Sequence, residues 1–487
     1  MRVKSKDLES KIMDATSAVR LFISKASSIG FGGMGGQSVP KAIPKAMAEV
    51  SEQKNINFSL SIFTGGGGTP QFEDNLSKID IPRRYYYLSG GNSREKINKG
   101  ETEFFDYWVG EYSRFLRDGY ITHGKKIDIS VIEATGIDEN GNIIPSLSVD
   151  AVPALIDASN KIIIEINESK PYLLGLHDIY LPELGKPINI SDPLDRIGKP
   201  FIRVKESKIA AVVITSEKEV AGGSYSSVQD TDIVIAENIA KFLEEEDKKG
   251  TITEKNPLQL GAGPIASAIL DKLSRDHIRI WSEIIPAKWA RSLGSKVDAI
   301  SASALYTLPG EEKHLRYVFD NLEYVKKHIV LRSSEVENSP EIILRLGVIA
   351  VQQAIEIDIF GSANVSHING MIHNGVGGSG DFTRASKLVI VALPSTASNG
   401  KFSRIVPMLF NTDIPKQDVD VVATEFGVAD LRGLSPKERA KEIIGICSHP
   451  KYKDLLLEYY KKAFSKSGHV PVDLEAAMEF NKKISTT

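Results

Sequence analysis

One acidic residue in an otherwise apolar segment is the first candidate for chemistry. Glu283 lies within Trp281–Pro286 (WSEIIP), whose pattern predicts the end of a strand. Burying a carboxylate among apolar neighbours costs free energy unless the group is paired or used, and perturbed carboxyl groups gather at functional sites. The alternative is an edge-strand residue that faces water, and the local sequence leaves both interpretations open.

A glycine-rich segment is the second candidate. Residues Asn374–Asp381 read NGVGGSGD, with glycine at 375, 377, 378 and 380. Such a segment can form a tight loop with exposed N–H groups, which can hold an oxyanion or a phosphate. Because this conformational freedom costs entropy on folding, we favour a functional loop over an elaborate turn.

Two shorter glycine runs follow apolar segments. Gly65–Gly68 comes after the apolar run Phe58–Phe63, and Gly261-Ala262-Gly263 precedes a predicted helix, Ala266–Leu273. Glycine allows close backbone approach to a ligand, and a following helix N-terminus favours an anion. A flexible surface turn explains 65–68 equally well, and a plain turn is the simpler interpretation of 261–263. No GxxxxGK[ST] loop occurs, and GxGxxG is incomplete because Ala266 takes its last glycine position.

Several common catalytic and metal-binding motifs are missing from the sequence. It contains no HExxH and no GxSxG, although His367 and His373 lie close together. Cys447, the only cysteine, stands beside Ser448 and His449. Catalytic pairs usually meet in space rather than in sequence, so we expect a packed Cys447 and no metal site.

Composition excludes several classes of protein. The chain has 487 residues, enough for two or three domains. With 63 acidic and 60 basic residues its formal net charge is −3, which argues against a nucleic-acid or polybasic membrane binder. No apolar stretch approaches the ~18 residues of a membrane helix, and Met1–Phe22 lacks the apolar core of a signal peptide. We therefore expect a soluble cytoplasmic protein.

Strand-like and helix-like segments alternate along the chain. Because strands that alternate with helices are typical of βαβ units, the sequence predicts an α/β fold with mainly parallel sheets. The apolar runs Ile127–Ile132, Lys161–Ile164, Ala210–Ile214 and Leu388–Val391 predict strands, and the amphipathic segments Asp232–Glu245 and Pro340–Ala354 predict helices.

The chain also shows signs of an internal repeat. Gly32 and Gly261 are about 229 residues apart, and a predicted helix follows each of their loops. The Ile-Asp-Ile strings at 127–129 and 357–359 are about 230 apart, and the Ala-Ser pairs at 158–159 and 385–386 about 227. Because the three matches occur in the same order and at nearly the same offset, they predict two related α/β domains, 1–225 and 226–487. Short strings can also match by chance. The predicted join is the polar stretch Ser216–Asp230.

A set of short segments, in order, matches one known family. They are the glycine loop near Gly32, Gly261–Gly263, Ser282–Ile285, Ser301–Ser303, Leu331-Arg332, Asn338–Ile343, Arg345–Ala350, Asn374–Phe382, Ile405–Pro407 and Ala429–Pro436. Through them the sequence resembles the acetyl-CoA hydrolase/transferase family over nearly its whole length. That family includes succinyl-CoA:acetate and propionyl-CoA:succinate CoA-transferases.

The resemblance implies a CoA-transferase-like fold and a role for each candidate residue. Glu283 would attack the acyl-CoA thioester, and the CoA thiolate would then convert the resulting anhydride into a glutamyl-CoA thioester. The Asn338 side-chain amide and the Gly378 backbone N–H would stabilise the oxyanions. The expected CoA contacts are Gly261, Ala262, Gly263, Pro264, Ile265, Asn374 and Gly378. CoA is thus expected as a substrate and covalent intermediate, with no tightly bound cofactor.

Three departures from the family pattern bear on the substrate. Pro286 and Ala287 stand where relatives often carry glutamine and an acid, and Val365 replaces a serine in an Asn-Ser-Thr-His pattern. Lys401 is a shifted counterpart of a CoA-contacting lysine. These changes concern the acyl pocket and CoA binding more than the chemistry.

The resemblance leaves three functions to distinguish. The first is a CoA-transferase between a short-chain acyl-CoA (acetyl-, succinyl- or propionyl-CoA) and a carboxylate such as acetate or succinate. The second is an acetyl-CoA hydrolase, in which water intercepts the glutamyl intermediate. The third is a CoA-binding protein without turnover, which the joint presence of Glu283, Asn338 and Gly378 disfavours. A homodimer is expected from the resemblance alone.

Overall fold

A computed structural model describes residues 2–53, 56–88, 91–218, 227–261, 263–308, 310–466 and 468–484, and of Lys483 only the backbone. Contacts divide the chain into two compact units. The first unit comprises Met1–Ser224 and Arg279–Arg345, and the second comprises Tyr225–Ile278 and Leu346–Thr487. Much of the predicted join Ser216–Asp230 lies outside the described residues.

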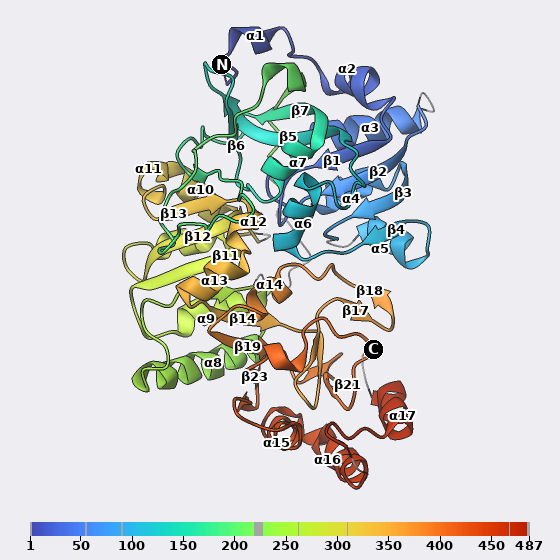
Figure 1. Cartoon of the computed structure of the whole chain (residues 1–487), viewed down its shortest axis with the longest axis vertical. Coiled ribbons are helices and arrows are strands. Elements are labelled where there is room, and N and C mark those ends of the chain that lie inside the picture. The colour runs from blue at the N-terminus through green and yellow to red at the C-terminus, as the bar shows by residue number, and fades with distance from the viewer. Residues whose placement is uncertain are drawn as a thin grey trace. The chain divides into compact units, whose positions relative to one another are not determined.

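Helices and strands alternate along the chain, as the sequence predicts (Figure 1). The α-helices are α1 (Lys6–Glu9), α2 (Ala15–Ala18), α3 (Ala42–Glu52), α4 (Pro70–Leu76), α5 (Gly91–Asn98), α6 (Val109–Arg117), α7 (Val152–Ala158), α8 (Asp230–Lys248), α9 (Pro264–Lys272), α10 (Glu312–Asp320), α11 (Leu322–Val325), α12 (Ser334–Glu337), α13 (Pro340–Leu346), α14 (Ser379–Thr383), α15 (Pro436–Glu442), α16 (Pro450–Phe464) and α17 (Leu474–Ile484). The strands are β1 (Ser28–Phe31), β2 (Ser59–Thr64), β3 (Asp80–Tyr85), β4 (Glu103–Phe105), β5 (Ile127–Ile137), β6 (Ile143–Pro145), β7 (Ser159–Asn167), β8 (His177–Asp178), β9 (Ile209–Thr215), β10 (Leu258–Leu260), β11 (Ile278–Pro286), β12 (Val297–Tyr306), β13 (Ile329–Arg332), β14 (Ile349–Gln353), β15 (Glu356–Asp358), β16 (Ala363–Asn364), β17 (His367–Ile368), β18 (Met371–Ile372), β19 (Leu388–Ala392), β20 (Thr396–Ala397), β21 (Phe402–Ser403), β22 (Ile405–Val406), β23 (Val421–Thr424) and β24 (Gly427–Asp430).

The first unit contains a large sheet with the order β4-β3-β2-β1-β5-β7-β9. Its neighbours run parallel, for example Ile29 beside Ile62 and Ile129, and β6 alone adds an antiparallel edge to β5. Isoleucine and valine fill both faces of β5 and β7, which is typical of a parallel sheet covered on both sides. Helix α7 packs against β1, β5 and β7 (Figure 1).

The first unit also includes the strands that carry the candidate glutamate. In order these are β11-β12-β13-β8. Residues 147–178 hold them to the N-terminal part of the chain, because Ser148 bridges Ala304 and β8 pairs with β13 in parallel. The structure therefore places Glu283 in the first unit, whereas the sequence analysis assigned it to a domain spanning 226–487. That linear division, 1–225 and 226–487, stays a prediction.

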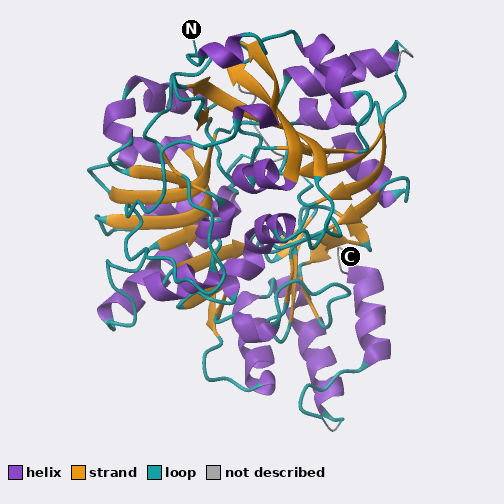
Figure 2. Cartoon of the chain, turned by 45° about the horizontal axis from the view of Figure 1, so that its top comes forward, coloured by secondary structure: helices purple, strands orange, loops and turns teal. Residues whose placement is uncertain are grey.

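The second unit has a five-strand run with the order β24-β23-β19-β14-β10. Strands β10, β14, β19 and β23 are parallel, and β24 returns antiparallel to β23. Helices α15, α16 and α17 (red in Figure 1) pack on a hydrophobic core formed by residues between 354 and 480. Buried Leu456, Tyr459 and Phe480 belong to this core. Helices flank the strands of the sheets, as Figure 2 shows.

The strand order supports the predicted repeat. In the first unit, β1 is followed by a glycine loop and leads through β5 and β7 to β9. In the second, β10 is followed by the Gly261 loop and leads through β14 and β19 to β23 in the same parallel order. The Ala-Ser pairs precede or begin β7 and β19, which occupy equivalent places.

Two local predictions are wrong. The predicted helix Pro340–Ala354 ends at Leu346, because Gly347 adopts φ 63° and stops it, and the β-branched residues that follow form β14. The string at 357–359 begins in β15, a short strand of a separate three-stranded sheet. It is therefore no counterpart of 127–129, which begins β5.

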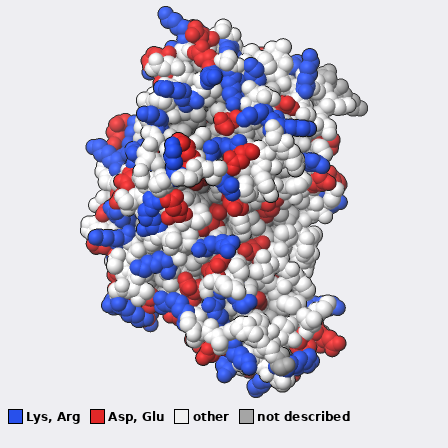
Figure 3. All heavy atoms as spheres, in the orientation of Figure 1, with Lys and Arg blue, Asp and Glu red and all other residues white. Residues whose placement is uncertain are grey.

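The distribution of charge on the surface and the character of the helices agree with what the composition indicates. Acidic and basic side chains are interspersed on the face drawn in Figure 3. Within the described residues, none of the helices has the length and apolar character needed to span a bilayer.

Candidate active site

Glu283 and Asn338 meet in the first unit. Glu283 is near the carboxyl end of β11, and Asn338 directly follows the short helix α12. The Asn338 Nδ2 donates a hydrogen bond to Glu283 Oε2 at 2.9 Å. Trp281 Nε1 donates to the Glu337 carbonyl at 2.7 Å and so fixes α12 against β11. The two first-unit residues that the resemblance implicates in catalysis are therefore in direct contact.

The surroundings of Glu283 make its carboxyl group a weak acid. Its side chain keeps partial solvent access, but the carboxyl lies deep among protein atoms. Burial raises its pKa to about 7, the Asn338 hydrogen bond acts in the opposite direction, and the charge of Asp150 raises it further. Near neutral pH the group therefore exists in both ionisation states, which suits a nucleophile that must carry charge in one step only.

Two more buried carboxyl groups lie nearby. Burial raises the pKa of Glu337 to about 8 and that of Asp150 to about 6. Ser301 Oγ donates to Glu337 at 2.7 Å and itself accepts from Arg332 Nε at 2.9 Å. The charges of these groups act on one another, since Asp150 raises the pKa of Glu283 and Glu283 raises that of Glu337.

Two glycine loops meet beside Glu283. The Gly35 N–H donates to the Gly66 carbonyl at 3.0 Å. A Cβ atom on Gly35, which has φ 60°, would overlap the Ile284 side chain. Gly65 to Gly68 are all buried, so this run is no surface turn. Glycine is required at position 35 because its backbone packs against the side chain of Ile284, the residue after Glu283.

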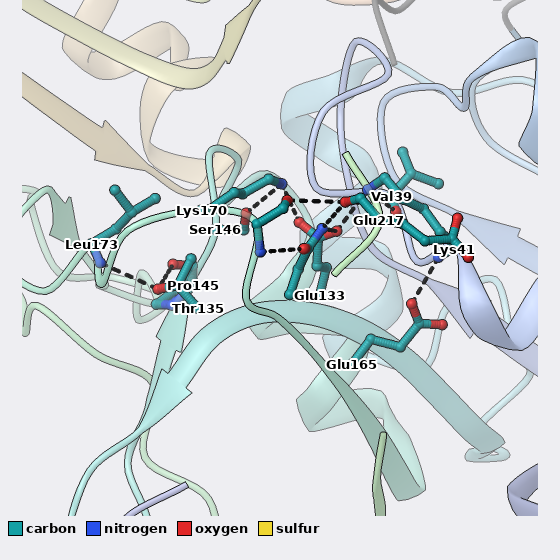
Figure 4. Close-up of polar contacts among 12 residues, drawn as sticks. Val39, Lys41, Glu133, Thr135, Pro145, Ser146, Glu165, Lys170, Leu173 and Glu217 are labelled. Carbon is teal, nitrogen blue, oxygen red and sulfur yellow. Dashed lines mark hydrogen bonds and ion pairs between the residues drawn. The ribbon is translucent and has the colours of Figure 1, made fainter. Parts of the chain in front are cut away.

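A buried ion cluster anchors the first of these loops. Figure 4 shows Glu133 between Lys41 and Lys170, with Lys41 Nζ at 2.6 Å and Lys170 Nζ also in contact. Burial alone would raise the pKa of Glu133, but the two ammonium groups outweigh it and hold the pKa at about 2. Lys41 Nζ also donates to the Val39 carbonyl at 3.0 Å. The cluster thus fixes the end of the loop that carries Gly35.

Glu165 holds the same loop at its C-terminal end, where α3 begins. Its carboxylate accepts backbone N–H groups of Lys41, Ala42 and Ile43 at 2.7–3.0 Å, at the start of α3 (Figure 4). An acid at a helix N-terminus satisfies the unpaired donors of the first turn. The N-terminus of α3 therefore already holds an anion from the protein itself.

In the second unit, the Gly261 loop leads into helix α9. Gly261 N–H bonds to the Val351 carbonyl at 3.3 Å, and Gly263 has φ 151°, where a Cβ would overlap Gln353. Pro264 occupies the first turn of α9, and Ile265 is buried. Ala262 lies outside the described residues. The loop matches the predicted glycine turn before a helix.

The second candidate loop is also in the second unit. Gly377 has φ 63°, and buried Gly378 is the N-cap residue of α14. The Asn374 N–H donates to the Ser366 carbonyl at 3.2 Å, and its side chain is half-buried. The N–H of Val365, the departure noted above, donates to Asp413 Oδ2 at 2.7 Å. The loop is a compact structure, as its glycine content predicts.

Four other residues singled out from the sequence take ordinary places. Lys401 is exposed and stacks over Phe402 at 5.0 Å. Pro286 ends β11 and Ala287 starts the turn after it, both buried. Cys447 is buried, and burial raises the pKa of its thiol to about 12, as expected for a packed cysteine. Across the described residues, no cluster of histidine, cysteine and acidic side chains could hold a metal.

The predicted site residues are thus divided between the two units. The first unit joins Glu283 to Asn338, and the second holds the described part of the Gly261–Ile265 loop with Asn374, Gly378 and Lys401. Asp150 and Glu337 are not among the site residues predicted from the sequence. Asp150 carries a usable signal, since it is an acid within the apolar segment Leu147–Ile156, as Glu283 is within its own.

Known sequence families and curated relatives identify the family of this chain. The acetyl-CoA hydrolase/transferase N-terminal domain matches residues 1–221, and the C-terminal domain of that family matches residues 315–460. An acetyl-CoA hydrolase of Yarrowia lipolytica is 36% identical, covering 99% of this chain and 97% of its own. A succinyl-CoA:acetate CoA-transferase of Clostridium kluyveri is 33% identical, covering 100% and 91%. A propanoyl-CoA:succinate CoA transferase of Escherichia coli is 34% identical, covering 98% of each.

Solved structures share the fold. RipA from Yersinia pestis superposes with a TM-score of 0.70 at 21% identity, covering 93% of this chain and 98% of its own. A 4-hydroxybutyrate CoA-transferase from Porphyromonas gingivalis gives 0.65 at 20% identity, with the same coverage. From the domain matches and the full-length relatives, the chain is an enzyme of the acetyl-CoA hydrolase/transferase family.

Proposed function

We propose that this enzyme transfers CoA between a short-chain acyl-CoA and a carboxylate such as acetate or succinate, through a glutamyl-CoA thioester on Glu283. The observation that carries the proposal is the buried carboxyl of Glu283 in contact with the Asn338 amide. The names of two relatives, which describe transfer to acetate and to succinate, support the substrate class.

The proposed reaction starts from ionised Glu283. One carboxylate oxygen attacks the thioester carbonyl, the C–S bond breaks, and CoA leaves as a thiolate with a mixed anhydride left behind. The thiolate then attacks the glutamyl carbonyl and expels the donor carboxylate, which gives the glutamyl-CoA thioester. An acceptor carboxylate reverses these steps. A raised pKa strengthens Glu283 as a nucleophile, although a smaller fraction is ionised below pH 7.

Two donors would stabilise the tetrahedral centres. Asn338 already donates to Glu283 Oε2, so its amide is placed to follow that oxygen when it becomes an oxyanion. The Gly378 N–H is the second proposed donor, at the start of α14. A donor held in advance costs no reorganisation during the reaction. Gly261–Ile265, Asn374 and Lys401 are the proposed CoA contacts.

An acetyl-CoA hydrolase is the second candidate. The partial exposure of the Glu283 side chain favours it, because water that reaches the glutamyl thioester would hydrolyse it. The Yarrowia lipolytica relative carries that name at similar identity. We further propose a homodimer in the cytoplasm, with no nucleic-acid or membrane partner, from the family resemblance and the near-neutral charge.

The test follows CoA and acyl groups together. The enzyme is incubated with acetyl-CoA, with and without succinate, and succinyl-CoA and free thiol are both measured. Succinyl-CoA without thiol release supports the transferase, and thiol release that needs no acceptor supports the hydrolase. Glu283→Ala should abolish either activity, and Asn338→Ala should lower kcat by about 10²–10³-fold, the usual cost of one oxyanion donor.

The control and the contrary outcome are equally specific. Asp128→Asn, at the start of β5 in a cluster with Ser27 and Ser28, should leave both rates unchanged. Turnover that persists in Glu283→Ala would refute the glutamyl intermediate. CoA binding without any product, over several donors and acceptors, would indicate a binding role.

A further inference from the structure

Asp150 occupies an unusual place in the first unit. It follows a segment that pairs with β12, where the Val149 N–H donates to the Ser303 carbonyl at 2.9 Å. Its side chain is 1% exposed, and its backbone has φ 42°. A non-glycine residue in this left-handed region is uncommon, although aspartate tolerates it better than most. The fold therefore accepts both a strained backbone and a buried acid at this position.

The contacts of Asp150 explain why the position matters. Its Oδ2 accepts the Gly66 N–H at 2.8 Å, and its backbone carbonyl accepts the Ser334 N–H at 3.3 Å. The Ser334 hydroxyl lies 3.2 Å from the Ser113 hydroxyl on α6. Oδ1 has no hydrogen-bond partner within the described part of the chain. Asp150 thus joins the second glycine loop, through its carboxylate, to the start of α12, through its backbone carbonyl.

Both of these partners lead directly to Glu283. Gly66 accepts the N–H of Gly35, which packs against the side chain of Ile284. Ser334 accepts the Asn338 N–H at 2.8 Å, and Asn338 binds the Glu283 carboxylate. Asp150 therefore contacts two segments, one that packs against Ile284 beside Glu283 in the chain and one that carries Asn338.

The charges around Asp150 leave it unneutralised. The titratable and charged groups that face it or its neighbours are Tyr112 and Arg117 on α6, Glu335 and Glu337 on α12, Glu283 on β11, and the Arg84–Glu73 pair. Both cations are already bound, Arg117 to Glu335 and Arg84 to Glu73. Among the residues that the structure describes, Asp150 has no cationic partner, so its negative field reaches Glu283 uncompensated.

We propose that Asp150 is a positioning residue of the active site. It holds the Gly66 turn and the Ser334–Asn338 segment in place, and it sets a second negative charge near Glu283 that makes the nucleophile more basic. The inference rests on the proposed role of Glu283. The uncompensated charge would be costly if Asp150 served packing alone, because a neutral side chain could fill the same space.

The test is the pH dependence of glutamyl-CoA formation, followed by mass spectrometry of the intact enzyme after acyl-CoA addition. In the wild-type enzyme the rate should rise with pH on the acidic side of this profile, which we call the acid limb. The midpoint of the limb should lie near pH 7, the pKa of Glu283. Asp150→Asn keeps the shape but removes the charge, so the limb should move to lower pH by about one unit, the usual size of a nearby-charge effect. Asp150→Glu keeps a charge and should leave the limb close to the wild-type position even if the maximal rate falls.

Control variants separate the possible failures. Asp128→Asn removes a carboxylate elsewhere in the first unit and should not move the limb. An unshifted limb in Asp150→Asn, with the adduct still forming, would overturn the role of Asp150 while leaving the glutamyl intermediate intact. Absence of the adduct in the wild-type enzyme at every pH would instead refute the proposed function. Asp150→Asn could fail to fold, and Asp150→Glu then provides the test. Because this variant keeps the negative charge, a shift of its acid limb to lower pH by about one unit would still overturn the charge effect.

Discussion

Replacing Glu283 by glutamine should abolish turnover and stabilise the folded enzyme at neutral and alkaline pH. Glutamine keeps the size of the side chain, and its carbonyl oxygen can accept the Asn338 hydrogen bond that Glu283 accepts now. The substitution therefore removes one thing, the negative charge. Because a raised pKa means that the fold resists ionisation of the group, the charge at this position destabilises the native state.

The magnitude follows from the pKa shift of Glu283. Its pKa rises from 4.5 to about 7 on folding, and each unit corresponds to about 1.4 kcal/mol. For an acid with a raised pKa, the folded state binds more protons than the unfolded state between these two values, so stability falls as pH rises through that window. The advantage of Glu283→Gln should thus be small near pH 4 and reach about 3 kcal/mol above pH 7.

Urea unfolding of both proteins between pH 4 and pH 8.5 measures the difference. Exposed Glu9→Gln serves as the matched control and should track the wild-type enzyme at every pH. A gain that is independent of pH would assign the effect to packing. Equal stability of the two proteins at pH 8.5 would refute the reasoning, since it would mean that Glu283 ionises in the fold at little cost.

Three further predictions concern the surroundings of the site and the thiol. Glu133→Gln leaves two buried ammonium groups poorly paired and should lower the free energy of unfolding by about 3–5 kcal/mol, whereas the same change at exposed Glu95 should leave the unfolding midpoint unchanged. Gly35→Ala should reduce kcat and stability, because its Cβ would overlap the adjoining isoleucine. Gly100→Ala, at φ 75° with nothing within 4 Å, measures the backbone cost alone, and equal losses would refute the overlap. Cys447, whose pKa is raised to about 12 by burial, should resist a thiol reagent at pH 8 until urea unfolds the protein, and rapid native labelling would contradict this.

Much of the architecture follows from local pattern. Runs such as 127–132 and 161–164 became β5 and β7 because β-branched residues favour strands and a parallel sheet buries both faces. The pattern failed at 340–354, where apolar spacing fits either a helix or a buried strand. A single glycine with φ 63° at 347 separated the two.

The site was only partly predictable for a different reason. Glu283 stands out because an acid in an apolar strand is costly, and the same argument applied to residue 150 would have found Asp150. The contact between Gly35 and Gly66, and the anchoring of the first loop by Glu133, join residues far apart in the sequence. No local pattern specifies such pairs.

By itself, the sequence determined the class of fold and the repeated order of strands and glycine loops, because these depend on side-chain type and spacing along the chain. It marked Glu283 as an unusual acid, and the resemblance to a known family implied its role as nucleophile. Tertiary structure alone decided that Arg279–Arg345 belongs with the N-terminal residues, that Asn338 bonds to Glu283, and that the charge of Asp150 acts on Glu283. The physical reason is that hydrogen bonding and ionisation depend on distances and burial, which arise only when segments far apart in the sequence pack together.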